Sequence, residues 1–195
     1  MKQPLIVLTG PTAVGKTALS IRLAKAVGGE IISADSMQVY RHMDIGSAKV
    51  TPMEMDGVPH YLIDVLDPQE PFNVVTFQQM AKEALREIYS HGRIPVIAGG
   101  TGFYIQALLY DIDFKENEDD SPVRRELEAL AEREGERAPR LLHSMLRQVD
   151  PEAAVQIHAN NIKRVIRAIE YFCQTGEKIS LHNQQEREKK SPYNF

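Results

Sequence analysis

The sequence predicts an α/β protein with a parallel sheet core over residues 1–113 and an all-helical insertion over residues 114–190. Strand and helix patterns alternate up to about residue 113, and only helical patterns follow. Alternation of this kind is typical of a parallel sheet, because a helix usually connects one parallel strand to the next. An acidic connector marks the change, and residues 191–195 have a strand pattern that we expect to resume the core.

A glycine-rich segment follows the first predicted strand, residues 4–9, and precedes a helical pattern over residues 17–27. It matches the P-loop pattern G-x-x-x-x-G-K-[ST] with Gly10, Pro11, Thr12, Ala13, Val14, Gly15, Lys16 and Thr17. In this context the backbone N–H groups bind phosphate oxygens, Lys16 adds a positive charge and the Thr17 hydroxyl ligates Mg²⁺. The alternative is a glycine-rich turn that only connects the two elements. The context favours a P-loop NTPase-like core that binds a di- or triphosphate.

The second predicted strand, residues 30–33, ends at a polar segment that begins with Asp35. Ligands of open α/β sheets bind at the carboxyl ends of the strands, so Asp35 is a candidate site residue. An aspartate that only forms a turn is the alternative. Residues 44–51 are polar and small and predict a mobile loop. The apolar run 61–65 predicts a third strand, which an Asp-Pro pair ends.

The next helix and strand lead to a second glycine-rich turn. Asn73 is a good N-cap, and apolar residues at helical spacing follow it. Residues 94–98 predict a buried strand, and the Gly-Gly-Thr-Gly turn at residues 99–102 joins it to an apolar helix over residues 103–110. The turn is either a tight connection or, since it lies on the same sheet edge as the P-loop, a turn that faces the ligand.

Beyond the acidic connector, residues 113–120, only helices are predicted. A Ser-Pro pair at residues 121–122 is typical of a helix start. Residues 161–173 show the clearest helical period, with Lys163 and Arg164 away from the apolar face. By periodicity alone, the two basic residues belong to a solvated face with i to i+3 or i+4 pairing, for which Arg167 and Glu170 are suitably spaced. The remaining helical patterns cover residues 123–134, 141–146 and 151–157, Gly176 is a C-cap candidate, and residues 184–190 are strongly polar.

The composition limits the class of protein. The 195 residues are 43% hydrophobic, enough for one sizeable core and a small second unit. The single cysteine, Cys173, forms no intrachain disulfide and indicates a reducing compartment. No leader pattern and no apolar run near the ~20 residues that span a bilayer are present, so we expect a soluble, cytoplasmic monomer without a membrane partner. The net charge of −4 counts against a surface coated by nucleic acid, but allows a local basic stripe.

Six motifs in order resemble one family, the tRNA dimethylallyltransferases, also called tRNA isopentenyltransferases. They lie at residues 10–17, 35–40, 43–49, 59–64, 99–104 and 150–164. The ordered set is far more specific than the P-loop alone and covers nearly the whole chain. Family members run on beyond this length, so we expect the chain to be the N-terminal two-thirds of such a protein and to be inactive, or nearly so, by itself.

The resemblance implies transfer of a dimethylallyl group from dimethylallyl diphosphate to the exocyclic amine of the adenine 3′-adjacent to the tRNA anticodon. It implies that residues 12–17 hold the diphosphate with Mg²⁺, that Lys16, Asp35 and Thr101 are catalytic, and that Asp35 is the base. The helical insertion would grip the anticodon stem-loop. The tRNA contacts that the resemblance implies are Asp35, Ser36, Met37, Gln38, Thr101, Arg124, Asn160, Asn161, Lys163 and Arg164.

The sequence departs from the family pattern at two positions. Val14 stands where serine is common in the P-loop, and only its backbone N–H is needed there. Ala159 stands where proline usually precedes the Asn pair, which affects the geometry of that tRNA contact. Three other functions use a similar P-loop: a small-molecule kinase with Asp35 as base, a non-catalytic nucleotide switch that binds ATP or a similar nucleotide, and a prenyltransferase acting on free adenine nucleotides.

Overall fold

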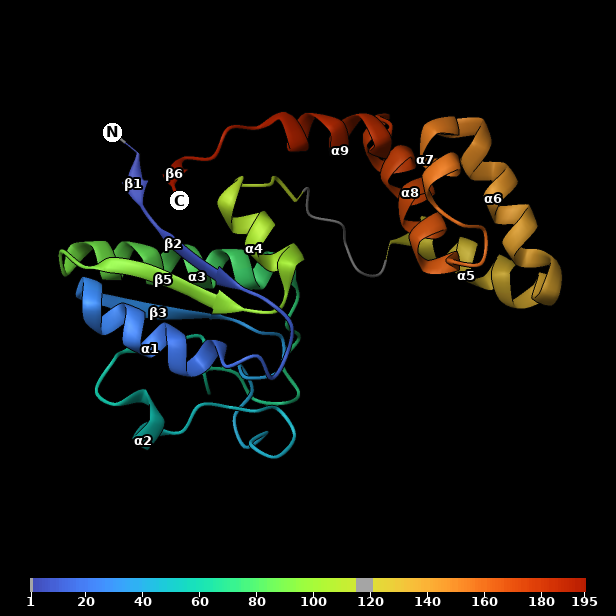
Figure 1. The fold of residues 1–195 in the computed structure, drawn as a ribbon. Helices are drawn as coiled ribbons and strands as arrows, with labels where there is room; N and C mark the ends of the chain where they lie inside the picture. Colours follow the sequence, from blue (N-terminus) through green and yellow to red (C-terminus); the bar gives the residue numbers. More distant parts are fainter. Residues whose placement is uncertain (1, 115–120) are drawn as a thin grey trace. The chain divides into compact units, whose positions relative to one another are not determined.

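The computed structural model describes residues 2–114 and 121–195 and divides into two compact units (Figure 1). The core unit comprises the residues up to Ile112 together with Lys190–Phe195, and the helical unit comprises Asp113–Lys189. Residues 115–120, most of the acidic connector, lie outside the described residues. Within the described ranges, no helix is long and apolar enough to cross a membrane.

The core unit is built on a parallel sheet of four strands in the order β2-β5-β3-β4. These strands are β2 (Ile6–Thr9), β5 (Ile94–Gly99), β3 (Gly29–Ala34) and β4 (His60–Tyr61). A second, two-stranded sheet pairs β1 (Gln3–Pro4) in parallel with β6 (Tyr193–Asn194), so the strand expected at the end of the chain is present. The predicted α/β class with a parallel sheet is confirmed.

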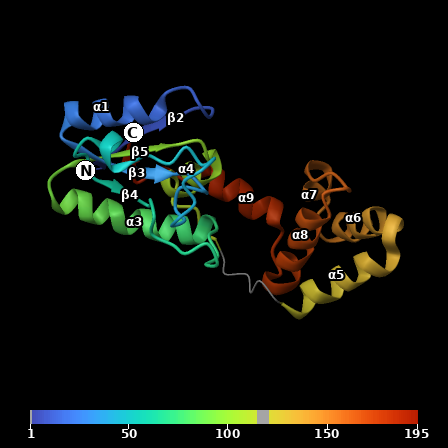
Figure 2. The same ribbon diagram turned by 90° about the horizontal axis from the view of Figure 1, so that it is seen from below.

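Helices cover both faces of the four-stranded sheet, as Figures 1 and 2 show from two directions. On one face, α1 (Lys16–Val27) packs Ile21 and Ala24 against the sheet residues Ile31 and Val96. On the other face, α3 (Val74–Ser90) and α4 (Gly102–Leu109) form a second cluster with Ile32. Neighbouring residues of β3 therefore serve opposite layers, as the two-residue period of a strand requires. Asn73 caps α3 as predicted, accepting from Val75 and Thr76.

Three predictions for the core need correction. The first strand is interrupted at Leu5, which separates β1 from β2. The predicted strand over residues 61–65 is wrong beyond Tyr61, because Leu62 and Asp64 have φ angles of 61° and 54°, in the left-handed region that ends a strand. A short helix, α2 (Pro52–Met55), was not predicted, although Thr51 and Glu54 form a capping box at its start. Residues 44–51 form no helix or strand and are a loop, as expected, while the mobility of this loop stays a prediction.

The helical unit contains five α-helices within residues 121–189: α5 (Pro122–Glu134), α6 (Ala138–Val149), α7 (Pro151–Gln156), α8 (Ile162–Thr175) and α9 (Ile179–Glu188). A short 3₁₀ turn, Gly135–Arg137, joins α5 to α6. Leu142 and Leu146 of α6 pack against Val165 and Ile169 of α8 and form the centre of this unit. The basic residues of α8 lie outside that apolar stripe, as the helical period predicted.

The helix ends of this unit follow the sequence signals, with two differences. Ser121 caps α5 by accepting from the Arg124 N–H at 3.1 Å, and Gly176 ends α8 with a φ of 71°. The predicted helix over residues 141–146 extends through the whole of α6. Most of the polar stretch 184–190 belongs to α9, which its polar composition did not indicate as a helix. Glu186 in this stretch is buried.

Candidate functional site

Three strands of the core end at one edge of the sheet, and the predicted site residues follow these ends. Thr9, Gly99 and Ala34 are paired side by side in β2, β5 and β3. The P-loop, the glycine-rich turn and Asp35 therefore begin at the same edge. The Thr101 N–H also donates to the Ala34 carbonyl at 3.3 Å. The fold thus brings together three segments that are far apart along the chain and follow the strand ends Thr9, Ala34 and Gly99.

The second glycine-rich turn begins with Gly99, where strands β5 and β3 lie too close together for a side chain. A Cβ atom at Gly99 would lie 2.2 Å from the Ala34 carbonyl oxygen and 2.8 Å from the Ala34 Cβ. No side chain fits there without separating β5 from β3. Gly99 and Gly100 also line the cavity described below. The turn is therefore both a tight connection and a part of the cavity wall.

The P-loop leaves the first turn of α1 open to an anion. Gly15 precedes α1 with a φ of 83°, and Ala13 also lies in the left-handed region, with a φ of 66°. No side chain caps the start of this helix, so its first N–H groups have no side-chain acceptor. Such N–H groups, at the positive end of the helix dipole, bind phosphate oxygens. The Lys16 ammonium donates to the Pro11 carbonyl at 2.6 Å and folds back over the loop.

A cavity of about 270 Å³ lies between the P-loop and the segment that follows β3. Lys16 and Thr17 line one side, and Asp35 and Gln38 line the other. Its apolar wall includes Ile31, Val50 and Ile63. Of the eight P-loop residues, those that line the cavity are Thr12, Ala13, Gly15, Lys16 and Thr17. Among the described residues, no group of three or more His, Cys, Asp and Glu side chains is placed to hold a metal; Thr17, the predicted Mg²⁺ ligand, lines the cavity, and its metal role stays a prediction.

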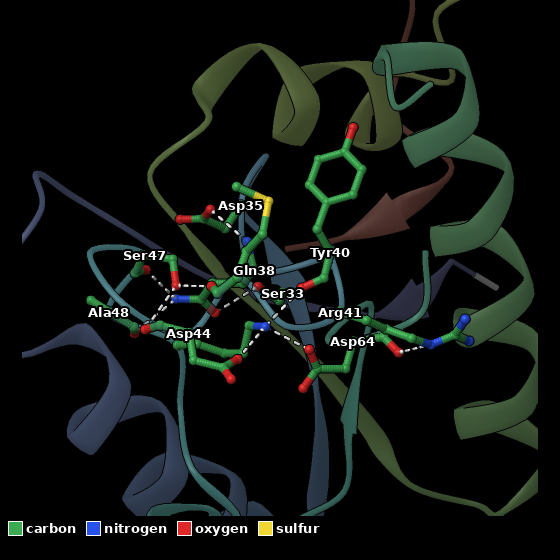
Figure 3. Close-up of polar contacts among 11 residues, drawn as sticks. Ser33, Asp35, Gln38, Tyr40, Arg41, Asp44, Ser47, Ala48 and Asp64 are labelled. Atoms are coloured by element: carbon green, nitrogen blue, oxygen red, sulfur yellow. Dashed lines mark hydrogen bonds and ion pairs between the residues drawn. The ribbon is translucent and has the colours of Figure 1, made fainter. Parts of the chain in front are cut away.

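The Asp35 carboxylate forms a turn and still faces the cavity (Figure 3). Its Oδ1 accepts from the Met37 N–H at 2.8 Å and from the Gln38 N–H at 3.3 Å. Within residues 2–114 and 121–195, no hydrogen bond is found to Oδ2. Asp35 thus does form the turn that was considered as the alternative. The turn uses only Oδ1, so Oδ2 can bind a ligand. Ser36 and Met37 of the same turn are exposed.

Both ends of the Gln38 side-chain amide form hydrogen bonds within the protein. Its Oε1 accepts from the Ser33 hydroxyl at 3.3 Å, and its Nε2 donates to the Ala48 carbonyl at 3.1 Å. Gln38 therefore ties the end of β3 to the loop at 44–51 (Figure 3). As a nucleotide contact it stays a prediction, because both ends of the amide already have partners in the protein.

His60 also lines the cavity, and the sequence analysis gave it no role. Its Nδ1 lies 2.8 Å from the Val58 carbonyl, so this nitrogen carries the proton. Burial lowers the pKa of His60, more than the bond to Val58 raises it, and favours the neutral ring. The Nε2 atom is then an acceptor; it is buried and has no partner in the described part of the chain. The family motif at residues 59–64 includes His60, but no local pattern there predicts a buried ring in the cavity wall.

The candidate tRNA contacts of the helical unit lie on α8 and just before it. Lys163 and Arg164 are exposed, and so is Asn160. Asn161 is the N-cap of α8, although its bond from the Arg164 N–H is long at 3.4 Å. Glu170, which is suitably spaced to pair with Arg167, is fully buried, and the charge of Arg167 helps to lower the pKa of its carboxyl group.

Arg124 has an internal partner. Its Nη2 donates to Oε2 of Glu170 at 2.7 Å, and the Ser121 hydroxyl donates to the same carboxylate. Burial by itself raises the pKa of Glu170, but the hydrogen bonds from Arg124 and Ser121 outweigh it and hold the pKa below its usual value. This ion pair fastens the start of α5 to α8. Whether Arg124 also reaches a nucleic acid stays a prediction.

The parallel sheet, the P-loop at its edge and the cavity beside it define a P-loop NTPase-like α/β protein. The IPP transferase family model matches residues 38–195, so the chain belongs to that family.

The chain is 66% identical over 193 residues to a tRNA dimethylallyltransferase of Lachnoclostridium phytofermentans, covering 99% of this chain and 61% of that protein. It is 53% identical to one of Bacillus cytotoxicus, covering 92% and 56%. Among solved structures, it resembles a full-length tRNA isopentenylpyrophosphate transferase of Bacillus halodurans, with 49% identity, a TM-score of 0.60 and coverage of 90% and 57%. It also resembles a eukaryotic dimethylallyltransferase acting on tRNA, with 30% identity, a TM-score of 0.80 and coverage of 99% and 46%. The chain thus spans 46–61% of the length of these relatives.

Proposed function

We propose that this chain belongs to an enzyme that transfers a dimethylallyl group from dimethylallyl diphosphate to the exocyclic amine of the adenine 3′-adjacent to the anticodon of tRNA. The observation that carries the proposal is the cavity, which has a phosphate-binding loop on one side and the Asp35 carboxylate on the other. This arrangement suits a diphosphate leaving group and a proton acceptor in one reaction. The names of the tRNA-modifying relatives support it.

The P-loop side of the cavity takes the donor. The open N–H groups of α1 bind the diphosphate oxygens, and the Lys16 ammonium moves from the Pro11 carbonyl to the phosphate. These donors stabilise the negative charge that grows on the leaving group as its carbon–oxygen bond breaks. The Thr17 hydroxyl would hold Mg²⁺, which neutralises diphosphate charge when bound.

The Asp35 side of the cavity takes the acceptor. The adenine amine is a weak nucleophile and must lose a proton as the new carbon–nitrogen bond forms. Oδ2 of Asp35 accepts that proton, while Oδ1 stays bonded to the turn. A base in this role typically contributes about 10²–10⁴-fold to the rate. The adenine has to leave its stack to reach the cavity, and Thr101 lies at the neighbouring strand end to contact it.

The helical unit supplies the contacts to the anticodon stem-loop. The exposed Lys163 and Arg164 side chains bind backbone phosphates, and Asn160 and Asn161 contact the nucleotides beside them. Arg124 supports this surface through its bond to Glu170. We further propose that the enzyme acts in the cytoplasm, a reducing compartment that its single cysteine favours, and that it acts as a monomer.

The molecule that accepts the dimethylallyl group distinguishes the proposed function from its alternatives. The full-length protein is incubated with Mg²⁺, labelled dimethylallyl diphosphate and either unmodified tRNA or AMP. Label is expected in tRNA alone. A matched tRNA with hypoxanthine in place of the target adenine lacks the exocyclic amine and must take no label. Label in AMP would favour a prenyltransferase of free nucleotides. Phosphoryl transfer from ATP to a small molecule, without prenyl transfer, would favour a kinase.

A further inference from the structure

The buried Lys49 ammonium is the centre of a polar cluster beside the candidate site, and its carboxylate partners Asp44 and Asp64 are exposed. Only 5% of its side chain is exposed. Its Nζ donates to the Tyr40 carbonyl at 2.7 Å, to Oδ1 of Asp44 at 2.7 Å and to Oδ1 of Asp64 at 2.5 Å. An ammonium has three N–H donors, so all three are used. Figure 3 shows the three acceptor residues on separate segments of the chain.

These segments have little regular structure of their own. His42, Ala48 and Asp64 have φ angles of 63°, 49° and 54°. Residues other than glycine rarely adopt this conformation, and it persists only where neighbouring contacts fix it. Lys49 supplies such a contact to Asp64, and its one cation joins the end of the Asp35 segment, the loop at 44–51 and the residues after β4.

The cluster continues directly to Asp35. Ala48, next to Lys49 in the chain, accepts from the Gln38 amide, and the Asp64 N–H donates to the Gln38 carbonyl at 3.1 Å. The Gln38 N–H in turn donates to the Asp35 carboxylate. Of the two residues that hold Gln38, Asp64 is thus bonded to Lys49 and Ala48 precedes Lys49 in the chain, and Gln38 holds the carboxylate.

We propose that Lys49 is a positioning residue for the transfer reaction, which fixes the direction of the Asp35 carboxylate through the loop at 44–51 and Gln38. The inference rests on the proposed function, in which Asp35 is the base. Burial by itself lowers the pKa of Lys49, but the hydrogen bonds that it donates to the Asp44 and Asp64 carboxylates outweigh this and raise the pKa above 10.5. The ammonium therefore stays charged throughout the pH range of an assay.

Lys49→Met tests the inference, since methionine retains the length of the side chain and removes the three donors. Single-turnover transfer at saturating donor is expected to fall about 10- to 100-fold, as for other misplacements of about 1 Å in a catalytic group. Affinity for dimethylallyl diphosphate is expected to stay within twofold, because the P-loop is untouched. Lys25→Met is the matched control: Lys25 forms an exposed ion pair with Asp56 on the same unit, and its loss should leave the rate unchanged. A normal rate in Lys49→Met would overturn the inference.

Coupling to Gln38 separates positioning from general stability. The rate loss in the double variant Lys49→Met with Gln38→Ala should be smaller than the product of the two single losses, because both act on the same carboxylate. Gln38→Ala removes the side-chain bond to Ala48 and keeps the backbone bonds to Asp35 and Asp64, so fully multiplicative losses would contradict the route through the Gln38 side chain. Asp44→Asn is a milder second variant, because it leaves Lys49 with Asp64 and the Tyr40 carbonyl; a smaller loss in the same direction is expected.

Hydrogen exchange of the 195-residue chain tests the positioning without any activity. The Met37 and Gln38 amides bond to Asp35 and should exchange faster in Lys49→Met than in Lys25→Met. If unsubstituted full-length protein transfers no label while this exchange difference is found, the proposed function fails and the positioning stands. Equal exchange in both variants would refute the positioning whatever the activity is.

Discussion

Asp150→Ala should destabilise the helical unit more than the loss of an ordinary helix cap does. Asp150 is fully buried and caps α7 by accepting from the Ala153 N–H at 3.0 Å. It also accepts from the Ser180 N–H at 2.9 Å and the Ser180 hydroxyl at 2.7 Å, at the start of α9. One carboxylate thus joins two helices that are thirty residues apart in sequence.

The magnitude follows from these three bonds. Loss of a typical N-cap costs about 0.5–2 kcal/mol, and each hydrogen bond to a charged group contributes about 1.5–3 kcal/mol. Removing the carboxylate also removes its own burial cost, which offsets part of the sum. We therefore expect the free energy of unfolding of the helical unit to fall by about 3 kcal/mol, since donors of Ser180 and Ala153 are left buried without an acceptor.

Urea unfolding of the 195-residue chain, followed by circular dichroism at the helix band, measures this change. Asn161→Ala is the matched control, because Asn161 caps α8 at the surface with one long bond; about 1 kcal/mol or less is expected there. Equal losses in the two variants would refute the role of Asp150 as a joint between α7 and α9.

The same carboxylate predicts a loss of stability in acid. Burial by itself raises the pKa of Asp150, but the hydrogen bonds from Ser180 and Ala153 outweigh it and lower the pKa below 3.8. A carboxylate with a lowered pKa in the folded state stabilises the fold above its ordinary pKa, and this contribution disappears as the pH falls through the lowered value. Below pH 3.8, the difference in stability between the natural chain and Asp150→Ala should therefore shrink. A constant difference would contradict the assignment.

Three further predictions concern the cavity and α8. Lys16→Ala should lower turnover while tRNA affinity stays unchanged; a collapse of tRNA binding with normal transfer by the bound fraction would give Lys16 another role. Replacing Lys163 and Arg164 together by alanine should reduce the slope of log affinity for tRNA against log salt by about 1.4–1.8, and an unchanged slope would make them a solvated face. Gly99→Ala should destabilise the core by about 1–3 kcal/mol, because its Cβ would overlap the neighbouring strand, whereas Gly102→Ala, which meets no atom within 4 Å, should cost less than 1 kcal/mol.

The features that follow from local patterns could be predicted from the sequence. The P-loop is a continuous motif between a strand and a helix. Asp35 and Thr101 were placed correctly at one sheet edge because parallel strands bring their carboxyl ends together. The N-caps Asn73 and Ser121 also follow from neighbouring residues alone.

The features that depend on contacts between distant residues could not be predicted in this way. The bonds of Lys49 to Asp64 and of Arg124 to Glu170 join residues that are 15 and 46 positions apart, so no local pattern records them. The run after Tyr61 is apolar enough for a strand, yet the chain turns at Leu62 to bond with the Gln38 segment. Helical periodicity is detected from buried apolar residues, but α9 buries the polar residues Ser180 and Glu186. The sequence pattern therefore did not predict this helix.

Single-turnover transfer by Asp35→Asn tests the central claim most directly. Asparagine keeps the size of the side chain, and its Oδ1 still accepts the Met37 and Gln38 N–H bonds of the turn. It cannot take the proton of the adenine amine. With full-length protein, labelled donor and saturating tRNA, we predict a rate lower by about 10²-fold or more, with tRNA affinity nearly unchanged because phosphate contacts dominate it. A transfer rate close to that of the natural protein would eliminate Asp35 as the base and leave it only the turn.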